Sequence, residues 1–334
     1  MRPCSERHPA LGVSLMELSI IFVNWNSLDY LRESITSVYE YTHDVPFEII
    51  VVDNASLEGG MESLKQQFPD VRIIVSSKNL GFSAGNNLGY KHSSGAYLLF
   101  LNPDTRLNSP AINILLRHLK SLPDAGVVGC KLLNTDLSVQ TSCIQTFPTI
   151  LNQIMDVEWL RLRWPQFCLW GIGPLFSTNE KPTAVEMISG ACMMLKRDVF
   201  IQAELFPEDY FMYADDLELC YKVRRIGFSN YYVGEATVIH HGGKSTSQKV
   251  NQWATVMKFR AIHKFLVKTR GWTYGMAYRV AMVGSAIARL MILGLMTPAK
   301  KCREEREMLR SASVKWIAIL KWALGIDETV VPRG

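Results

Sequence analysis

Four short runs of apolar residues divide the first third of the chain, and a polar turn follows each of them. The runs cover residues 18–23, 47–52, 71–75 and 97–101. They are rich in β-branched residues and almost free of polar ones, as is typical of strands buried on both faces of a parallel sheet. Apolar residues also recur at helical spacing over 28–38 and 112–119. This alternation predicts an α/β fold with a mostly parallel central sheet.

The pattern becomes irregular over residues 131–182, which contain four prolines together with Trp159, Trp164 and Trp170. We interpret this segment as an insertion whose aromatic rings either cap a core or stack on sugar rings, and we favour the core. Regular structure is predicted to resume with a strand over 187–195 and a helix within 210–225. Two short strands, 231–233 and 236–239, are expected after it.

Polar residues stand where each of the first four strands ends. Ligands on parallel sheets bind outside the carboxyl ends of the strands, so these positions carry information about function. Turn formation alone explains any one of them. Four on one edge indicate a crevice that offers amides and a carboxylate to a nucleotide or a sugar. The residues are Asn24, Asn26, Asp53, Asn79, Asn102 and Asp104.

Glycines punctuate the segment that follows the third strand, at Gly81, Gly85 and Gly89. Their spacing does not match the G-x-G-x-x-G dinucleotide fingerprint. Glycines at the start of a helix let the backbone approach a ligand, but they also let a helix pack closely on a sheet. The residues alone leave both explanations open.

Three acidic residues, Asp215, Asp216 and Glu218, stand near the start of the helix predicted to run through residue 225. Helix capping accounts for one acid at such a place and poorly for three. Crowding and burial raise the pKa of a carboxyl group toward neutral pH, which suits a general base. His240 and His241 follow the last predicted strand and are candidates to orient a phosphate or bind a metal.

The distribution of charge and the cysteine content indicate what kind of partner the protein has and in which compartment it works. The 334 residues carry a formal net charge of +5, but from Lys244 onward 17 basic residues face only five acidic ones. Such asymmetry favours a polyanionic partner for the tail. The seven cysteines are scattered and form no C-x-x-C pair, which favours reduced thiols in the cytoplasm over a disulfide framework. Residues 1–17 lack the apolar core of a signal peptide and are expected to form a leader.

The tail is predicted to be a basic, amphipathic, helical region. On one continuous helix, Lys268, Arg279 and Arg289 would form a narrow cationic stripe beside an apolar surface, an arrangement suited to an anionic membrane surface. The most apolar stretch, 272–297, is interrupted by two arginines, so no uninterrupted spanning segment is expected. The alternative is that these helices pack on the catalytic domain or form a homo-oligomer. Nucleic acid is disfavoured as a partner because the basic residues alternate with long apolar stretches.

Seven segments, taken in order, closely resemble motifs of the family 2 glycosyltransferases, in particular the bacterial rhamnosyltransferase-like members. The order of all seven is far more specific than any one of them. The resemblance runs from about Leu18 to Ser245. It rests on residues 22–26, 51–56, 79–87, 101–104, 189–192, 212–220 and 240–245.

The resemblance implies a GT-A fold over residues 18–245, with residues 246–334 as a C-terminal extension. It also implies a nucleotide-diphosphate-sugar donor, a divalent metal (Mg²⁺ or Mn²⁺) and inversion at the anomeric carbon. Asp104 matches a carboxylate metal ligand, and His240 the histidine that completes the site. Asp216 matches the catalytic base, with Asp215 and Glu218 beside it. The positions matched to donor binding are Asn24, Asn26, Asp53, Asn79, Gly81, Gly85, Asn102, Ser189 and Gly190.

The expected reaction is transfer of a sugar, with rhamnose as the first choice, from a dTDP- or UDP-linked donor to a polysaccharide or lipid-linked glycan. The enzyme is expected in the cytoplasm, peripheral on the inner membrane. A sugar-nucleotide pyrophosphorylase is the rival enzyme, but it needs basic residues near the first strand, and residues 18–26 contain none. An inactive transferase-like scaffold is the third hypothesis.

Overall fold

The computed structural model describes residues 16–177, 181–242, 252–296 and 302–326. The predicted leader lies almost entirely outside these residues, as does the predicted boundary near residue 245. At the centre of the described part is a nine-stranded sheet in the order β3-β2-β1-β4-β10-β6-β11-β5, with β8 also paired to β11. Its strands are β1 (Leu18–Asn24), β2 (Phe47–Asp53), β3 (Arg72–Val75), β4 (Tyr97–Leu101), β5 (Thr105–Leu107), β6 (Ala125–Leu133), β8 (Thr183–Val185), β10 (Cys192–Lys196) and β11 (Ser229–His240).

The first four strands are parallel, as the apolar runs predict. The other half of the sheet is mixed, because β10 runs antiparallel between β4 and β6 while β11 runs parallel to β6. The strand predicted over 187–195 is interrupted at Ser189–Ala191, which separates β10 from the short β9 (Met187–Ile188); β9 pairs with β7 (Ile144–Gln145). The two short strands predicted after residue 230 are one strand, β11, with a register shift between Val233 and Thr237.

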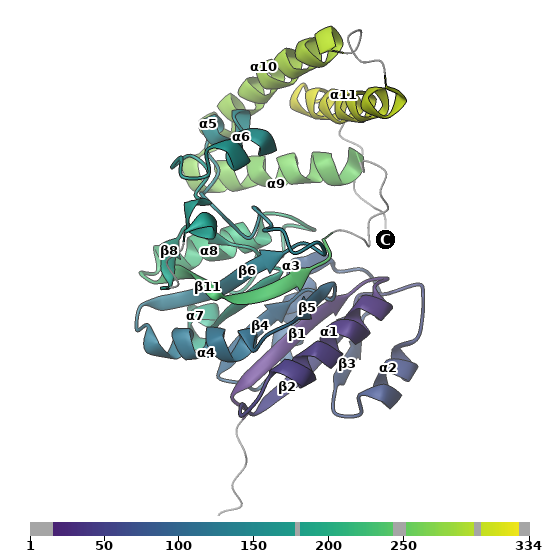
Figure 1. The fold of residues 1–334 in the computed structure, drawn as a ribbon, viewed down its shortest axis with the longest axis vertical. Coiled ribbons are helices and arrows are strands. Elements are labelled where there is room, and N and C mark those ends of the chain that lie inside the picture. Colours follow the sequence, from purple (N-terminus) through teal and green to yellow (C-terminus); the bar gives the residue numbers. More distant parts are fainter. Residues whose placement is uncertain (1–15, 178–180, 243–251, 297–301, 327–334) are drawn as a thin grey trace, which may run out of the picture.

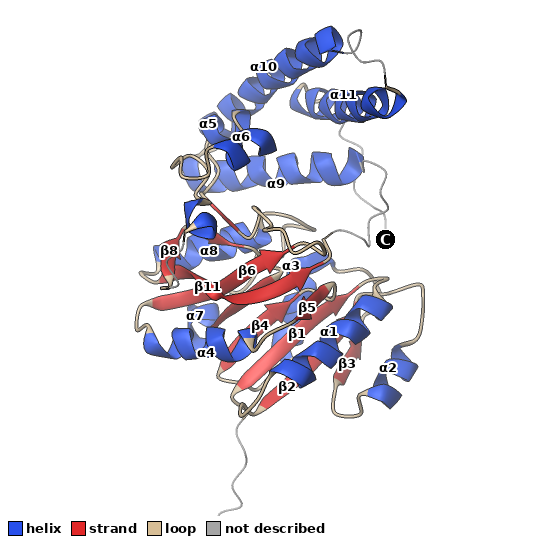
Figure 2. Ribbon diagram, viewed as in Figure 1, coloured by secondary structure: helices blue, strands red, loops and turns tan. Residues whose placement is uncertain are grey.

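Helices cover both faces of the sheet, with α1 and α4 on one face and α3, α7 and α8 on the other (Figure 2). Close packing of α3 on the sheet explains Gly89 and also Gly85, which was predicted to bind the donor. A Cβ at Gly85 would lie 2.8 Å from Val23, and one at Gly89 would lie 2.5 Å from Ile21, both on β1. The helices are α1 (Leu28–Tyr41), α2 (Met61–Gln67), α3 (Gly81–Lys91), α4 (Ala111–Ser121), α7 (Arg197–Gln202) and α8 (Asp215–Arg225).

The segment 131–182 has more structure than its sequence indicates. It contains α5 (Ile150–Ile154), α6 (Glu158–Arg163) and the 3₁₀ helix η1 (Gly173–Phe176) in addition to β7. The prediction that its tryptophans belong to a core holds for Trp170, which is buried. It is wrong for Trp159 and Trp164, which are 65% and 52% exposed.

Three long helices, α9 (Gln252–Arg270), α10 (Trp272–Met296) and α11 (Arg303–Ala323), confirm the predicted helical extension. They lie to one side of the sheet (Figure 1). Phe265 and Leu266 of α9 share a second apolar core with Tyr210 and Leu217 of the sheet domain, and α10 and α11 complete that core. The extension is therefore packed onto the sheet domain through α9.

The predicted cationic stripe is wrong, because its residues do not share a helix. Gly271, with φ of +88°, separates Lys268 on α9 from the two arginines of α10. Each cation also has contacts within the molecule. Lys268 pairs with Asp209 and Glu218 at 2.8 Å and 3.0 Å, Arg279 donates to the carbonyl of Trp322, and Arg289 donates to the carbonyls of Ile154 and Asp156.

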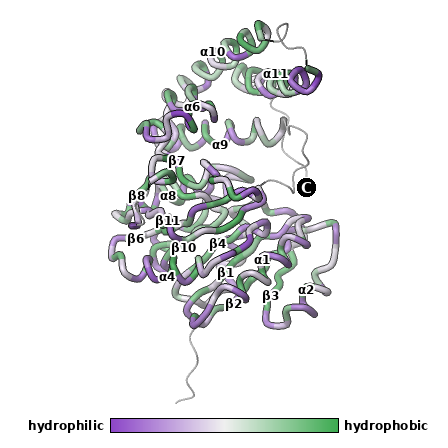
Figure 3. Tube along the Cα trace, viewed as in Figure 1, coloured by the Kyte–Doolittle hydropathy of each residue, from purple (hydrophilic) through white to green (hydrophobic). Residues whose placement is uncertain are grey.

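Among the described residues, one helix, α10, is long and apolar enough to cross a membrane by length and composition, and most of it is not buried by the rest of the protein. Its hydropathy is visible along the trace in Figure 3. Core helices of soluble proteins can have the same length and composition.

Candidate active site

A pocket of about 870 Å³ opens where the carboxyl ends of the parallel strands meet the insertion and α9. This is the edge at which the sequence predicts a ligand crevice. Of the predicted site residues, it brings together Asn79, Gly81, Asn102, Asp104, Ser189, Gly190, Asp215, Asp216 and His240. Asn24, Asn26, Asp53, Gly85 and Glu218 are not among the side chains that line it.

Two amides shape the rim where β2 and β3 end. Asn54 donates to the side-chain oxygen of Asn79 at 2.9 Å and to the carbonyl of Gly81, and it accepts from the N–H of Leu80. Gly81 has φ of +77°, and a Cβ there would lie 2.2 Å from the carbonyl oxygen of Phe211. Only glycine is compatible with this position. Asn54 lines the pocket, although the sequence-based selection omitted it.

Behind this rim, Asn24 and Asp53 form a buried layer. Asn24 is fully buried, and its amide donates to Asp53 at 3.4 Å and to Ser56 at 3.1 Å. The side-chain oxygen of Asn26 accepts from the N–H of Leu57. These residues hold the turns after β1 and β2 in place, and Trp25 and Asn54 present the surface to the pocket.

Asp104 and His240 meet at the end of β4. Asp104 Oδ1 lies 3.3 Å from His240 Nε2, and Asn102 Nδ2 lies 3.4 Å from the same nitrogen. Burial opposes ionisation of Asp104, but the contact with His240 outweighs it, and the pKa of the carboxyl group is lowered. His241 does not line the pocket and packs against Tyr30 instead. Of the two histidines, His240 is the one at the site.

The backbone that leads into α8 is strained. Tyr213 and Ala214 both have positive φ, 68° and 61°, immediately before Asp215. Non-glycine residues rarely adopt this conformation, and such strain is concentrated at functional sites. Here it turns the chain sharply, so that the first turn of α8 presents its acidic residues to the pocket.

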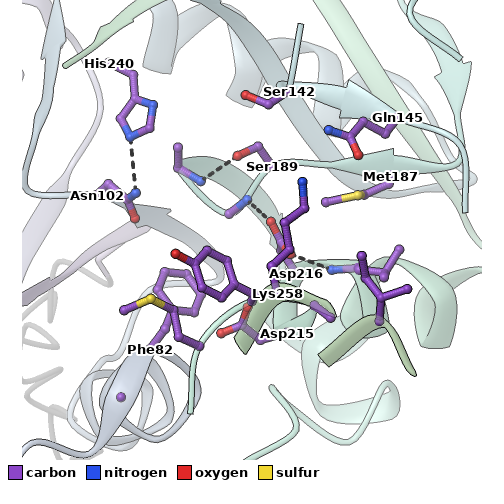
Figure 4. A pocket seen from close by; sticks show the side chains of 18 of the residues that line it. Phe82, Asn102, Ser142, Gln145, Met187, Ser189, Asp215, Asp216, His240 and Lys258 are labelled. Atoms are coloured by element: carbon purple, nitrogen blue, oxygen red, sulfur yellow. Dashed lines mark hydrogen bonds between the residues drawn. The ribbon is translucent and has the colours of Figure 1, made fainter. Parts of the chain in front are cut away.

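Asp216 is fixed by two backbone hydrogen bonds. Gly190 donates to its Oδ2 at 2.9 Å and Leu217 to its Oδ1 at 2.8 Å. The break between β9 and β10 is what brings Gly190 to this carboxylate, and Figure 4 shows the contact. Burial raises the pKa of Asp216, and the two N–H groups partly oppose the rise. A half-buried carboxylate held in this way can accept a proton from a ligand.

Asp215 is 4% exposed, and its Oδ2 accepts from Ser83 at 3.4 Å. Burial, followed by repulsion from Asp216, raises the pKa of Asp215 to about 7. Two adjacent buried carboxyl groups resist ionising together. The backbone N–H groups of Gly190 and Leu217 favour the charged form of Asp216, which makes Asp216 the better candidate to carry the negative charge.

The predicted catalytic role of Glu218 is not supported by its position. Its carboxylate accepts from Tyr210 at 2.7 Å and pairs with Lys268 of α9 at 3.0 Å. All of these contacts lie away from the pocket lining. Glu218 joins α8 to α9, a role that sequence spacing could not reveal because its partner lies 50 residues further on.

The pocket also includes residues that the sequence analysis missed. Trp253 and Lys258 come from α9, and Arg161 and Trp170 come from the insertion. Figure 4 shows Lys258 beside Asp216. No motif marks these positions, because the pocket wall forms only when α9 packs on the sheet domain.

Comparison with known proteins agrees with this architecture. The family model "Glycosyl transferase family 2" matches residues 19–202, more than half of the chain. Among characterised relatives, the N-acetylglucosaminyl-diphospho-decaprenol L-rhamnosyltransferase of Mycobacterium tuberculosis is 26% identical over 246 residues, which are 69% of this chain and 78% of the relative. Rhamnosyltransferase WbbL of Escherichia coli K12 is 24% identical, over 72% of this chain and 90% of the relative.

A mannosyltransferase from Pyrobaculum calidifontis, solved with GDP-mannose and Mn²⁺, superposes with a TM-score of 0.55 at 15% identity, covering 93% of this chain and 86% of that one. At 15% identity, this structural similarity supports a shared fold. The chain belongs to glycosyl transferase family 2 and is rhamnosyltransferase-like, with a GT-A-type fold and a C-terminal helical extension. It is a glycosyltransferase.

Proposed function

We propose that the protein is an inverting glycosyltransferase that moves a sugar, most simply rhamnose, from a dTDP- or UDP-linked donor to a lipid-linked glycan. The observation that carries this proposal is the placement of Asp216 in the same pocket as Asp104 and His240. One end of the pocket offers a site for a diphosphate and its metal, and the other offers a base. Rhamnose is supported by two relatives named as rhamnosyltransferases.

In the proposed reaction, Asp216 accepts the proton of an acceptor hydroxyl as its oxygen attacks the anomeric carbon. The new carbon–oxygen bond forms as the bond to the donor phosphate breaks, and that electron pair leaves on the nucleoside diphosphate. A single displacement inverts the anomeric carbon. Gly190 and Leu217 hold the Asp216 carboxylate toward the acceptor, and Asp215 retains its proton and does not compete for the same hydroxyl.

A divalent cation suits the contact between Asp104 and His240. His240 Nδ1 donates to Gln140 Oε1 at 2.9 Å, which leaves the lone pair of Nε2 facing Asp104 Oδ1. Two electron-rich atoms 3.3 Å apart need a cation between them, either a proton on Nε2 or a metal ion. A ligating histidine commonly donates its other N–H in this way.

No group of three or more His, Cys, Asp or Glu side chains suited to a metal occurs in the part of the chain that the structure describes. Asp104 and His240 would therefore hold Mg²⁺ or Mn²⁺ together with donor phosphate oxygens and water, which is common for Mg²⁺. When bound, the ion would neutralise charge on the departing diphosphate.

We further propose that the enzyme works at the cytoplasmic surface of the inner membrane. Val280, Ile292 and Leu295 of α10 are 69%, 55% and 81% exposed, an apolar surface that the described part of the protein leaves uncovered. Because Arg279 and Arg289 are engaged internally, apolar burial carries this proposal more than a cationic stripe does.

A donor screen tests the proposed function. Purified protein is incubated with dTDP-rhamnose, UDP-glucose, UDP-galactofuranose and UDP-N-acetylglucosamine, each with Mg²⁺, Mn²⁺ or chelator, and hydrolysis and transfer are measured. We expect one donor to be used well above the others, with dTDP-rhamnose first. If all four remain intact with every metal, in the presence of a short-chain polyprenyl diphosphate N-acetylglucosamine acceptor, the proposal is wrong.

A further inference from the structure

The wall of the pocket nearest α9 and the insertion contains hydrogen-bond donors that have no acceptor among the described residues. Lys258 lines it as an exposed residue, and its ammonium group has no ion pair or hydrogen bond with the described residues. Three more N–H groups on lining side chains are buried and have no acceptor there, those of Arg161 Nε, Trp170 Nε1 and Trp253 Nε1. A donor that is buried without a partner is costly, so these groups point to a ligand rich in oxygen atoms.

The charge of this wall also favours an anion. Asp156, which also lines the pocket, pairs with Arg161 through a single contact of 3.4 Å, so Lys258 supplies the excess positive charge. Lys315 of α11 lies close enough to Lys258 for the two charges to repel, and burial together with this repulsion lowers the pKa of Lys315. The extension thus places an unpaired positive charge next to a pocket that already holds a base.

The position of Lys258 distinguishes between two candidate anions, the diphosphate of the donor and a diphosphate on the acceptor. In a single displacement the base and the attacking hydroxyl stand opposite the leaving group. Lys258 lies beside Asp216 (Figure 4) and attracts its carboxylate. It is therefore on the acceptor's side, whereas the leaving diphosphate belongs with Asp104 and His240.

We infer that Lys258, together with Arg161 of the same pocket, binds the phosphate groups of a diphosphate-linked acceptor and places the acceptor hydroxyl on Asp216. This inference rests on the proposed function and adds the subsite that selects the acceptor. It gives α9 a direct part in substrate binding. It also accounts for the packing of the extension onto the sheet domain at the edge of the active site.

Steady-state kinetics with two acceptors test the inference. The first is a short-chain polyprenyl diphosphate N-acetylglucosamine, and the second is octyl N-acetylglucosaminide, which carries the same sugar without phosphate. Lys258→Gln should raise KM for the first acceptor about tenfold or more, the usual cost of a lost charged hydrogen bond. It should leave KM for the second acceptor and for the donor unchanged. Lys258→Arg should restore most of the loss.

Arg260→Gln is the matched control, since Arg260 lies on the same helix and does not line the pocket. An equal rise of KM for both acceptors, or a rise for the donor instead, would overturn the inference. Because Lys258 attracts the Asp216 carboxylate, some shift of the pH profile of kcat is expected with both acceptors. That shift without any difference between the two acceptors in KM would show that Lys258 acts only on the pKa of Asp216, and would overturn the inference too.

Calorimetry separates this inference from the proposed function. The diphosphate acceptor is titrated into full-length protein saturated with dTDP and Mg²⁺, which fill the donor side. We expect binding that Lys258→Gln weakens. If wild-type protein does not bind the acceptor, the inference is wrong. If it binds the acceptor through Lys258 but transfers no sugar to it, the proposed function is wrong and the diphosphate subsite stands.

Discussion

At the scale of single residues, two adjacent carboxyl groups at the site differ in what surrounds them. Asp215 and Asp216 are adjacent in the chain, and Asp216 receives hydrogen bonds from the backbone N–H groups of Gly190 and Leu217. Asp215 is buried against Ser83. The difference in surroundings, and not in residue type, distinguishes the two carboxyl groups and is the basis of the roles proposed for them.

The raised pKa of Asp215 predicts a pH-dependent stability. Its pKa in the unfolded chain is near 3.9, and burial raises it to about 7 in the fold. Its stabilising contribution is complete below the unfolded value and is lost as the pH rises through about 7. Asp215→Asn should therefore be more stable than wild type at pH 8, by on the order of a few kcal/mol, and the gap should narrow at pH 5. Thermal unfolding at both pH values measures this, and a gap that does not change with pH would contradict it.

Asp104 and His240 predict a metal dependence at the same scale. Asp104→Ala should abolish Mn²⁺-dependent binding of dTDP, because it removes the charged ligand. His240→Ala should weaken that binding less. His241→Ala is the control, since His241 lies outside the pocket. Calorimetry with and without Mn²⁺ measures the affinity of each variant for dTDP. If wild-type protein binds dTDP equally well with and without Mn²⁺, the proposed metal site is wrong.

At the scale of elements, the contact between α8 and α9 holds the acidic turn and the pocket wall together. Glu218, whose side chain is 9% exposed, pairs with Lys268. Both Lys264 and Lys268 lie over the ring of Tyr210, at 5.0 Å and 4.8 Å from its centroid. A chain that ended before α9 would expose this surface and the Asp215–Asp216 turn.

Lys268→Met tests that contact, because it leaves the Glu218 carboxylate buried without its cation. We expect a loss of about 1–3 kcal/mol in the free energy of unfolding, below the figure for a fully buried pair because Lys268 is itself a third exposed. The double variant Glu218→Gln/Lys268→Met should recover most of the loss. Denaturant unfolding, with Lys264→Met as the more exposed control, measures it. A loss no larger than that of the control would show that the pair is unimportant.

The sequence predicted a helix or strand correctly where the pattern of residues within that element is enough to determine its structure. The strands β1, β2 and β4 are apolar runs, and their ends and lengths agree with the prediction to within a residue. The acidic turn was also visible. The antiparallel β10, the break at Gly190 and the pocket wall from α9 depend on contacts distant in sequence, and no local pattern encodes them. The prediction of a cationic stripe in the tail was wrong because Gly271 adopts a positive φ and separates α9 from α10. The sequence pattern did not reveal this break.

At the scale of the whole molecule, the extension and the insertion each carry a group of exposed apolar side chains. On α10 these include Val280, Met291, Ile292 and Leu295. On α6 and the segment after it, Trp159, Trp164 and Phe167 are more than half exposed. Aromatic and aliphatic side chains of this kind suit the interfacial region of a bilayer. α5 packs against α10, which brings the two groups near each other.

Vesicle co-sedimentation tests the membrane proposal. Full-length protein should pellet with anionic vesicles, and high salt should release only part of it, since charge attraction is screened while apolar burial is not. Ile292→Glu/Leu295→Glu should remain in the supernatant. If this variant pellets like wild type, the exposed apolar face of α10 does not bind the membrane. If it also converts a dimer to a monomer, that face is a contact between copies of the chain.

The central claim is that Asp216 removes the proton during sugar transfer, and single-turnover transfer by Asp216→Asn tests it most directly. Asparagine preserves the shape of the side chain but cannot accept the proton, so we expect the transfer rate to fall by at least about a hundredfold, with donor binding close to wild type. Asp215→Asn should reduce the rate much less. A transfer rate for Asp216→Asn near that of wild type would contradict the account.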